Sequence, residues 1–193
     1  MSVTETTTTA TRTVDGTEVP VAGTYVIDAS HSHAGFVVRH LMVSKVRGAF
    51  SGVSGTVEVG DDITASTVEV EIDPATVDTR DAGRDEHLRS ADFFGTEEFG
   101  SITYTSSGIR RDGGGWVLDG DLTIKGVARP VSLDLEFLGA VTDPWGGSRL
   151  GFTAGGELDR EDWGLNYNQA LETGGVVIGK KVTLEIEAEL VRQ

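Results

Sequence analysis

His31-Ser32-His33 has residue types and a spacing that could chelate a metal. In an extended segment, residues two apart point to the same face, so both imidazoles could bind one Zn²⁺ or Cu²⁺. The remaining ligands would have to come from His40, His87 or a carboxylate, and no spacing in the chain demands this. We therefore predict no metal site and interpret His31 as a hydrogen-bonding residue in a turn at a strand end.

Serine, histidine and aspartate all occur in the chain, so a small hydrolase or isomerase that uses His31, His40 or Asp85 is one hypothesis. Against it, the sequence contains no Gly-x-Ser-x-Gly elbow, no phosphate-binding glycine loop and no His-Glu-x-x-His zinc motif. The triple glycine Gly113 to Gly115 lies between two strand patterns and predicts a hairpin. We expect no catalytic residue and no cofactor, and hence no enzyme.

Charge and cysteine content exclude further classes of protein. The 193 residues carry 16 Lys and Arg against 31 Asp and Glu, a formal net charge of −15. Such an excess of negative charge disfavours binding to DNA, RNA or an anionic membrane surface, because those affinities come from basic side chains. The absence of cysteine excludes disulfides and thiol chemistry.

The N-terminal segment 1–22 is rich in threonine and has no hydrophobic periodicity. We predict a flexible arm there, followed by one domain over residues 23–193. A secretory signal needs an apolar stretch of roughly 7–15 residues, and a membrane-spanning helix needs about 20. The sequence offers neither, so we expect no membrane insertion and a cytoplasmic location.

Alternation of apolar and polar residues with a period of two dominates from Gly23 onward, which is typical of strands with one buried face. In Thr67–Ile72, for instance, the three aliphatic residues alternate with threonine and glutamate. Only 80–94 reads as helical, with Asp81 as the N-cap. The pattern is clearest in 67–72, 116–125, 131–137 and 182–190, and weaker in 24–28, 35–40, 46–52, 55–59, 101–106 and 149–157.

Antiparallel strands at this spacing, with 26 glycines for turns and bends, favour an all-β fold. An up-and-down barrel of about eight strands is the architecture that we predict, because it can enclose one small ligand. A sandwich filled by side chains is the alternative. Gly120 falls on the apolar face of its strand, where it predicts a bend.

Four blocks of sequence, in order, resemble the YceI-like family of lipocalin-like proteins, and the likeness extends from Gly23 to Leu190. No single motif is specific, whereas four in order are. The blocks are Tyr25-Val26-Ile27-Asp28 with His31-Ser32, Phe36-Val37-Val38-Arg39-His40 and Val46-Arg47-Gly48-Ala49-Phe50; Arg84-Asp85-Glu86-His87-Leu88-Arg89-Ser90 with Asp92-Phe93-Phe94; Gly120 to Val127 with Arg129-Pro130-Val131; and Arg160-Glu161-Asp162-Trp163-Gly164.

The resemblance implies an extended antiparallel lipocalin-like barrel with a short helix near one end. It implies a long-chain polyisoprenoid or similar lipid in the apolar interior, without catalytic activity, and a homodimer. An apolar wall selects for length and shape, so polar specificity must come from the barrel mouth. The expected interior residues are Phe36, Val38, Phe50, Val68, Val70, Ile72, Leu88, Phe93, Phe94, Trp116, Leu118, Leu122, Ile124 and Phe152; the expected mouth residues are His31, Ser32, His40, Arg84, Asp85, His87 and Arg160.

Other interpretations stay open at the level of sequence. The arginines could pair with an anionic head group, or Arg84 could pair with Asp85, and Arg160 with Asp162 or Asp28, fixing the helix to the barrel rim. The ligand could instead be a fatty acid, a fatty amide or a hydrophobic antibiotic. A filled barrel that dimerises through exposed apolar residues such as Val117 or Leu138 is a further alternative.

Overall fold

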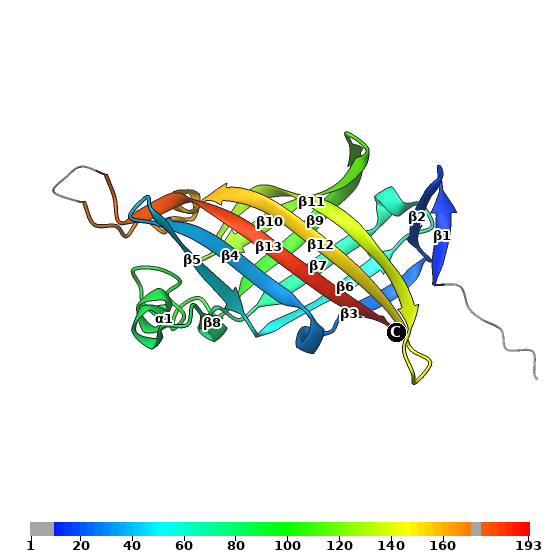
Figure 1. Ribbon diagram of the computed structural model, residues 1–193, viewed down its shortest axis with the longest axis horizontal. Coiled ribbons are helices and arrows are strands. Elements are labelled where there is room, and N and C mark those ends of the chain that lie inside the picture. The colour runs from blue at the N-terminus through cyan, green and yellow to red at the C-terminus, as the bar shows by residue number, and fades with distance from the viewer. Residues whose placement is uncertain (1–9, 171–174) are drawn as a thin grey trace, which may run out of the picture.

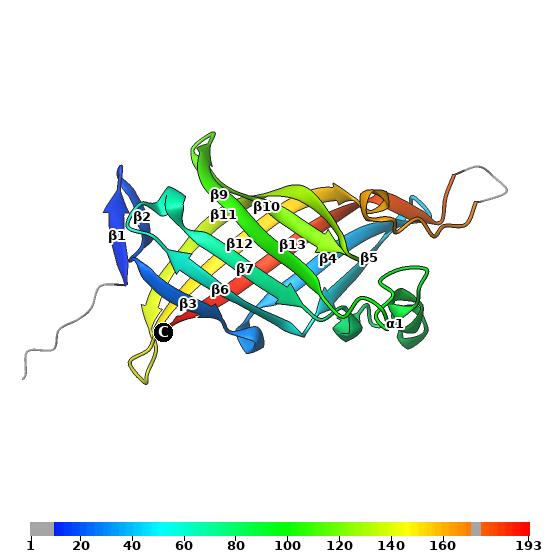
Figure 2. The same ribbon diagram turned by 180° about the vertical axis from the view of Figure 1, so that it is seen from behind.

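A computed structural model describes residues 10–170 and 175–193. In it the strands form a closed antiparallel barrel (Figures 1 and 2). Its wall runs in the order β12-β11-β10-β9-β7-β6-β3-β13 and closes through pairing of β12 with β13. The predicted eight-stranded barrel is thus confirmed. The strands are β1 (Thr11–Val14), β2 (Thr17–Pro20), β3 (Gly23–Ile27), β4 (His33–His40), β5 (Ser44–Phe50), β6 (Val53–Val59), β7 (Thr67–Ile72), β8 (Val77–Asp78), β9 (Ile102–Asp112), β10 (Gly115–Ile124), β11 (Val127–Thr142), β12 (Ser148–Asp159) and β13 (Ile178–Arg192).

The barrel wall forks at β13. On one side this strand pairs with β12 along almost its whole length. On the other side its first part pairs with β4, and its last three residues pair with β3. From β4 the sheet continues outside the closed ring to β5 and β8. The 3-10 helix η1 (Ala29–His31) is the corner between the two branches.

Each helical segment in the described residues begins at an aspartate whose side chain accepts a hydrogen bond from a backbone N–H of the first turn. These are N-cap hydrogen bonds, so some of the excess acidic residues stabilise the starts of helices. The segments are η1, η2 (Ile63–Ala65), η3 (Pro74–Thr76), α1 (Ala82–Arg89) and η4 (Arg160–Trp163). Asp81 caps α1 as predicted, although the helix is shorter than expected and Phe93 and Phe94 follow it in turns.

The two ends of the barrel are closed differently. At one end, which we call the hairpin end, β1 and β2 lie across the barrel, and Tyr25, Leu150 and Leu190 form a tightly packed cluster. At the other, the helix end, lie α1 and the tip of the β4–β5 hairpin (Figure 1). Trp163 of η4 is buried there and donates a hydrogen bond from Nε1 to the Leu122 carbonyl at 2.9 Å.

The β1–β2 hairpin differs from the predicted flexible arm. Residues 11–14 pair with residues 17–20 as two strands, and Val19 is 2% exposed. The Arg12 guanidinium donates to the carbonyls of Gly60 and Asp61 at 2.5 and 2.6 Å, which joins the hairpin to the turn after β6. Residues 1–9 of the predicted arm lie outside the described residues. The folded unit therefore begins before Gly23.

Two glycine-containing segments have the conformations predicted from the sequence. Gly113 and Gly114 both have positive φ and connect β9 to β10, as a two-residue hairpin turn requires. At Gly120 the register of β10 against β9 shifts, which confirms the bend. A Cβ at Gly120 would meet the Tyr104 ring at 2.6 Å, so the missing side chain makes room for that aromatic ring.

Candidate functional site: the apolar cavity

The barrel encloses a cavity of about 520 Å³ whose wall consists mainly of aliphatic and aromatic side chains. They come from the inward face of every strand of the ring and from β4, β5 and the segment after α1. All the residues expected in the interior line it, namely Phe36, Val38, Phe50, Val68, Val70, Ile72, Leu88, Phe93, Phe94, Trp116, Leu118, Leu122, Ile124 and Phe152. An apolar cavity of this kind accepts hydrocarbon more readily than water.

Other lining residues were not among the expected site residues. Leu133, Leu135 and Ile186 lie on apolar strand faces, so the same alternation could have found them. Tyr104 lies in a strand of threonines and serines and carried a weaker signal; its hydroxyl donates to the carbonyls of Leu118 and Val131 at 3.1 and 3.2 Å. Val19 was missed because its segment was expected to be an arm.

Five of the seven expected mouth residues line the cavity: Ser32, His40, Arg84, His87 and Arg160. Ser32 lies near η1, where its hydroxyl accepts from the backbone N–H of Glu189 at 3.0 Å. The other four lie at the helix end, where their contacts involve neighbouring residues. His40 is paired with Ile178 of β13, and Arg160 donates from Nε to the carbonyl of the next residue, Gly179, at 3.0 Å.

His87 and Arg84 are the other two expected mouth residues at the helix end. The His87 ring contacts the Tyr167 ring, with centroids 4.7 Å apart, and its Nε2 lies 2.9 Å from an Asp92 carboxylate oxygen. Arg84 donates to the Thr79 hydroxyl at 2.7 Å and to the Thr79 carbonyl at 2.8 Å. The predicted Arg84–Asp85 ion pair is therefore not formed.

Asp85 does not line the cavity. Its carboxylate is buried and accepts from the backbone N–H of Thr79 at 2.8 Å and from the Thr79 hydroxyl at 2.6 Å. Asp85 thus attaches α1 to the residue that follows β8, and its predicted place at the mouth is wrong.

Arg160 is a buried charged residue of the cavity wall. It is 3% exposed, it donates to the carbonyls of Gly179 and Leu165, and Nη2 has no hydrogen-bond partner among the described residues. Burial lowers the pKa of this guanidinium below its ordinary value. Neither Asp162 nor Asp28 pairs with it, contrary to one interpretation of the sequence. A buried cation with a free donor suits an anionic oxygen of a ligand.

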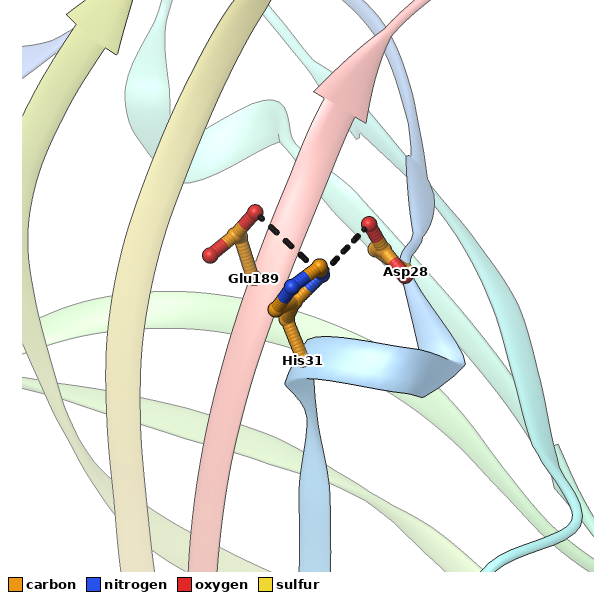
Figure 3. A group of neighbouring side chains, drawn as sticks. All are labelled: Asp28, His31 and Glu189. Atoms are coloured by element: carbon orange, nitrogen blue, oxygen red, sulfur yellow. Dashed lines mark hydrogen bonds and ion pairs between the residues drawn. The ribbon is translucent and has the colours of Figure 1, made fainter. Parts of the chain in front are cut away.

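His31 lies outside the cavity, in a cluster with Asp28 and Glu189 (Figure 3). Its Nδ1 is 3.0 Å from an Asp28 oxygen and 3.9 Å from a Glu189 oxygen. Because η1 is a 3-10 turn, the extended geometry required for chelation by His31 and His33 is not formed. Its interpretation as a hydrogen-bonding residue of a turn is confirmed, and its expected place at the mouth is wrong.

An arginine already supplies positive charge to that cluster. Arg149 Nη1 contacts both Asp28, at 2.8 Å, and Glu189, while its Nε lies 3.0 Å from Asp143. Hydrogen bonds to Asp28 above all, then to Asp143 and Glu189, raise the pKa of Arg149 above its ordinary value. The cluster is an ion network on the outside of the barrel near the hairpin end.

Among the described residues, those of the hydrolase hypothesis do not form one site. His40 lines the cavity, His31 belongs to the outer cluster, and Asp85 is engaged by Thr79. Val117, suggested as an exposed dimer contact, is 6% exposed, whereas Leu138 is 60% exposed. Among the helices of the described part, none is long and apolar enough to cross a membrane.

Comparison with known proteins agrees with the barrel fold. A family model described as the YceI-like domain matches residues 25–190. The chain belongs to this family. Among curated relatives, the UPF0312 protein SAS2572 of Staphylococcus aureus (strain MSSA476) is 42% identical over 168 residues, which cover 86% of this chain and 95% of that protein.

Solved structures share the fold of this YceI-like chain. BcnA of Burkholderia cenocepacia has a TM-score of 0.73 at 20% identity, covering 84% of this chain and 98% of that one. The YCEI protein of Campylobacter jejuni has a TM-score of 0.67 at 28% identity, over 80% and 90%. A polyisoprenoid binding domain from Saccharophagus degradans has a TM-score of 0.62 at 19% identity, over 88% and 98%. The family favours a binding protein over an enzyme.

Proposed function

We propose that this YceI-like protein binds a long-chain amphiphilic lipid, in the first place a polyisoprenoid, as a carrier, store or sequestering protein, and that it catalyses no reaction. The observation that carries the proposal is the apolar cavity with the buried, incompletely bonded guanidinium of Arg160 at its helix end. A chain inserted from that end would place its tail among the aromatic and aliphatic residues and its head group near Arg160, His40 and His87.

The energetics favour a prenyl tail. At roughly 0.8 kcal/mol per buried CH₂, each five-carbon isoprene unit contributes up to ~4 kcal/mol before the costs of association and ordering. The tail would therefore supply most of the affinity. A phosphate or pyrophosphate oxygen that accepts from Arg160 Nη2 would add a charge-assisted hydrogen bond.

A fatty acid is the second candidate, because its carboxylate could accept the same hydrogen bond from Arg160. Organic extraction of protein purified from its source organism, followed by mass spectrometry, would identify the resident ligand. Competition between prenyl lipids and fatty acids in titration would rank the two classes. If no lipid is extracted and neither class is taken up, the proposal is wrong.

Substitution of Arg160 tests the head-group contact. We expect Arg160→Gln to weaken binding of a prenyl pyrophosphate by about 10- to 100-fold, since hydrogen bonds to charged groups contribute ~1.5–3 kcal/mol. A prenol of the same length should lose much less, because it lacks the anionic oxygens. Equal losses for the two ligands would show that Arg160 acts only through the structure of the barrel. Arg110→Gln, an exposed arginine of β9 on the strand face that does not line the cavity, is the matched control.

Two further predictions of the sequence stay proposals. A homodimer would be detected by analytical ultracentrifugation, with Leu138→Ser as the variant that tests the suggested contact. A cytoplasmic location would be checked by fractionation of the source organism. Neither is required for binding in the cavity.

A further inference from the structure

The β4–β5 hairpin differs in charge from the rest of the chain. No aspartate or glutamate occurs from Ala29 to Val57, although the whole chain has 31 of them. The same stretch contains Arg39, Lys45 and Arg47. A molecule with a net charge of −15 therefore has one hairpin whose charged side chains are all basic.

The strand register brings these three cations together on one face. Arg39 of β4 is directly opposite Lys45 of β5, and Arg47 follows Lys45 two residues later on the same side of the strand. All three are exposed, and in the described part of the chain none makes an ion pair. Like charges directly opposite each other destabilise a strand pair, so this arrangement costs free energy unless an anionic surface approaches it.

The tip of the same hairpin exposes three consecutive apolar residues. Leu41, Met42 and Val43 are 38%, 58% and 83% exposed. Leu41 and Met42 both have positive φ, at 51° and 60°, which is a costly conformation for side chains of this size. The backbone is thus held in a strained turn that keeps apolar side chains in water.

We propose that the β4–β5 tip docks the barrel onto an anionic lipid bilayer. Leu41, Met42 and Val43 would enter the boundary between head groups and acyl chains, while the three cations contact lipid phosphates. The carboxylates on distant strands do not prevent this, because physiological salt screens exposed charges beyond about 8 Å. Basic side chains also protect edge strands from pairing, but that role leaves the apolar tip unexplained.

Docking at this hairpin would also orient the cavity. Val38 and His40 of β4 and Val46 of β5 line the cavity next to the tip. A bilayer in contact with Leu41–Val43 would therefore face the helix end, where the polar lining residues gather. The docking does not depend on which lipid the cavity takes.

Flotation of the purified full-length protein with lipid vesicles tests the proposal. We expect binding to vesicles of phosphatidylglycerol mixed with an excess of phosphatidylcholine, and weaker binding to phosphatidylcholine alone. Lys45→Gln and Arg47→Gln should each lower the partition coefficient about fivefold, because a basic residue near an anionic surface contributes ~1 kcal/mol. The pair Met42→Ser and Val43→Ser should lower it by about tenfold or more.

Matched controls keep the test specific to the hairpin. Trp145→Ser removes an apolar side chain that is 87% exposed in the β11–β12 turn, and Arg110→Gln removes an exposed cation of β9 near the β9–β10 turn. Both should leave the partition coefficient unchanged within about twofold. The inference is overturned if wild type does not prefer anionic vesicles, if the controls lose as much as the tip variants, or if the tip variants change only the oligomeric state. Unchanged uptake of a prenyl lipid by the tip variants would separate failure of docking from failure of the proposed cavity function.

Discussion

The hairpin end and the helix end of the barrel differ in how tightly their side chains are packed and in how much backbone strain they contain. At the hairpin end, Tyr25 and Leu150 are 0% and 1% exposed, and the Tyr25 hydroxyl donates to the Val21 carbonyl at 3.0 Å. At the helix end, Arg160 is buried with a donor that has no partner among residues 10–170 and 175–193, and Leu41 and Met42 are held at positive φ. Strained positions of large apolar residues therefore lie at the end where a ligand would enter, while tight packing at the far end supports the fold.

The largest effect that distinguishes the two ends should come from a leucine at each. We expect Leu150→Ala to lower the free energy of unfolding by ~2–5 kcal/mol, because its close-packed neighbours cannot fill the space that it leaves. Leu88→Ala, a half-buried leucine that borders the existing cavity, should cost less than about 2 kcal/mol. Urea denaturation measures both, and equal losses would contradict the contrast between the ends.

How much of this contrast could be predicted from sequence depends on the residues. Val68, Val70 and Ile72 were placed correctly because strand periodicity depends only on neighbouring residues. Val19 was not, since a short threonine-rich hairpin buries little apolar surface and is stabilised by bonds to distant turns, such as those from Arg12. Local pattern therefore predicted the wall of the barrel but not its cover.

The polar residues were predicted less well for a related reason. Arg160 was paired with Asp28 or Asp162 by chemistry alone, whereas in the fold Arg149, far along the chain from Asp28, takes that carboxylate. Which of several arginines meets a given carboxylate depends on strand register across the closed barrel. That register is a property of the tertiary fold. The sequence pattern therefore indicates which residue types form ion pairs, but not which residues pair with each other.

The next largest effect should come from the attachment of α1. We expect Asp85→Ala to lower the free energy of unfolding by ~1–3 kcal/mol, since it leaves the buried N–H and hydroxyl of Thr79 without their acceptor. Asp81→Ala, which removes the exposed N-cap of the same helix, should cost ~1 kcal/mol. Hydrogen exchange of the α1 amides would show whether the loss is confined to the helix end. A loss of Asp85 no larger than that of Asp81 would contradict the role assigned to it.

The smallest effect concerns acid at the hairpin end. Hydrogen bonds from Ser30, Arg149 and His31 hold the pKa of Asp28 well below its usual range, so its stabilising contribution is present above the unfolded pKa of ~3.9 and fades as the pH falls below it. Arg149→Gln should raise the pKa of Asp28 toward the ordinary value. We expect a lower Tm than wild type at pH 7 and a difference that shrinks below about pH 4.

Lys181→Gln is the control for that comparison. It removes an exposed ion pair with Glu157, of the kind that contributes little to stability, so its Tm should stay near that of wild type across the same pH range. A Tm difference for Arg149→Gln that stays constant from neutral to acid pH would mean that the arginine acts through packing instead of through Asp28.

The fork at β13 has a consequence for local opening. Because the ring closes through β3 and β12 without β4, β5 and β8, we expect those three strands to lose hydrogen bonds before the long pairing of β12 with β13 does. Their amides should therefore exchange with solvent at a lower opening free energy than those of β12. The barrel would then widen on one side only, next to the cavity, without passing through an unfolded state.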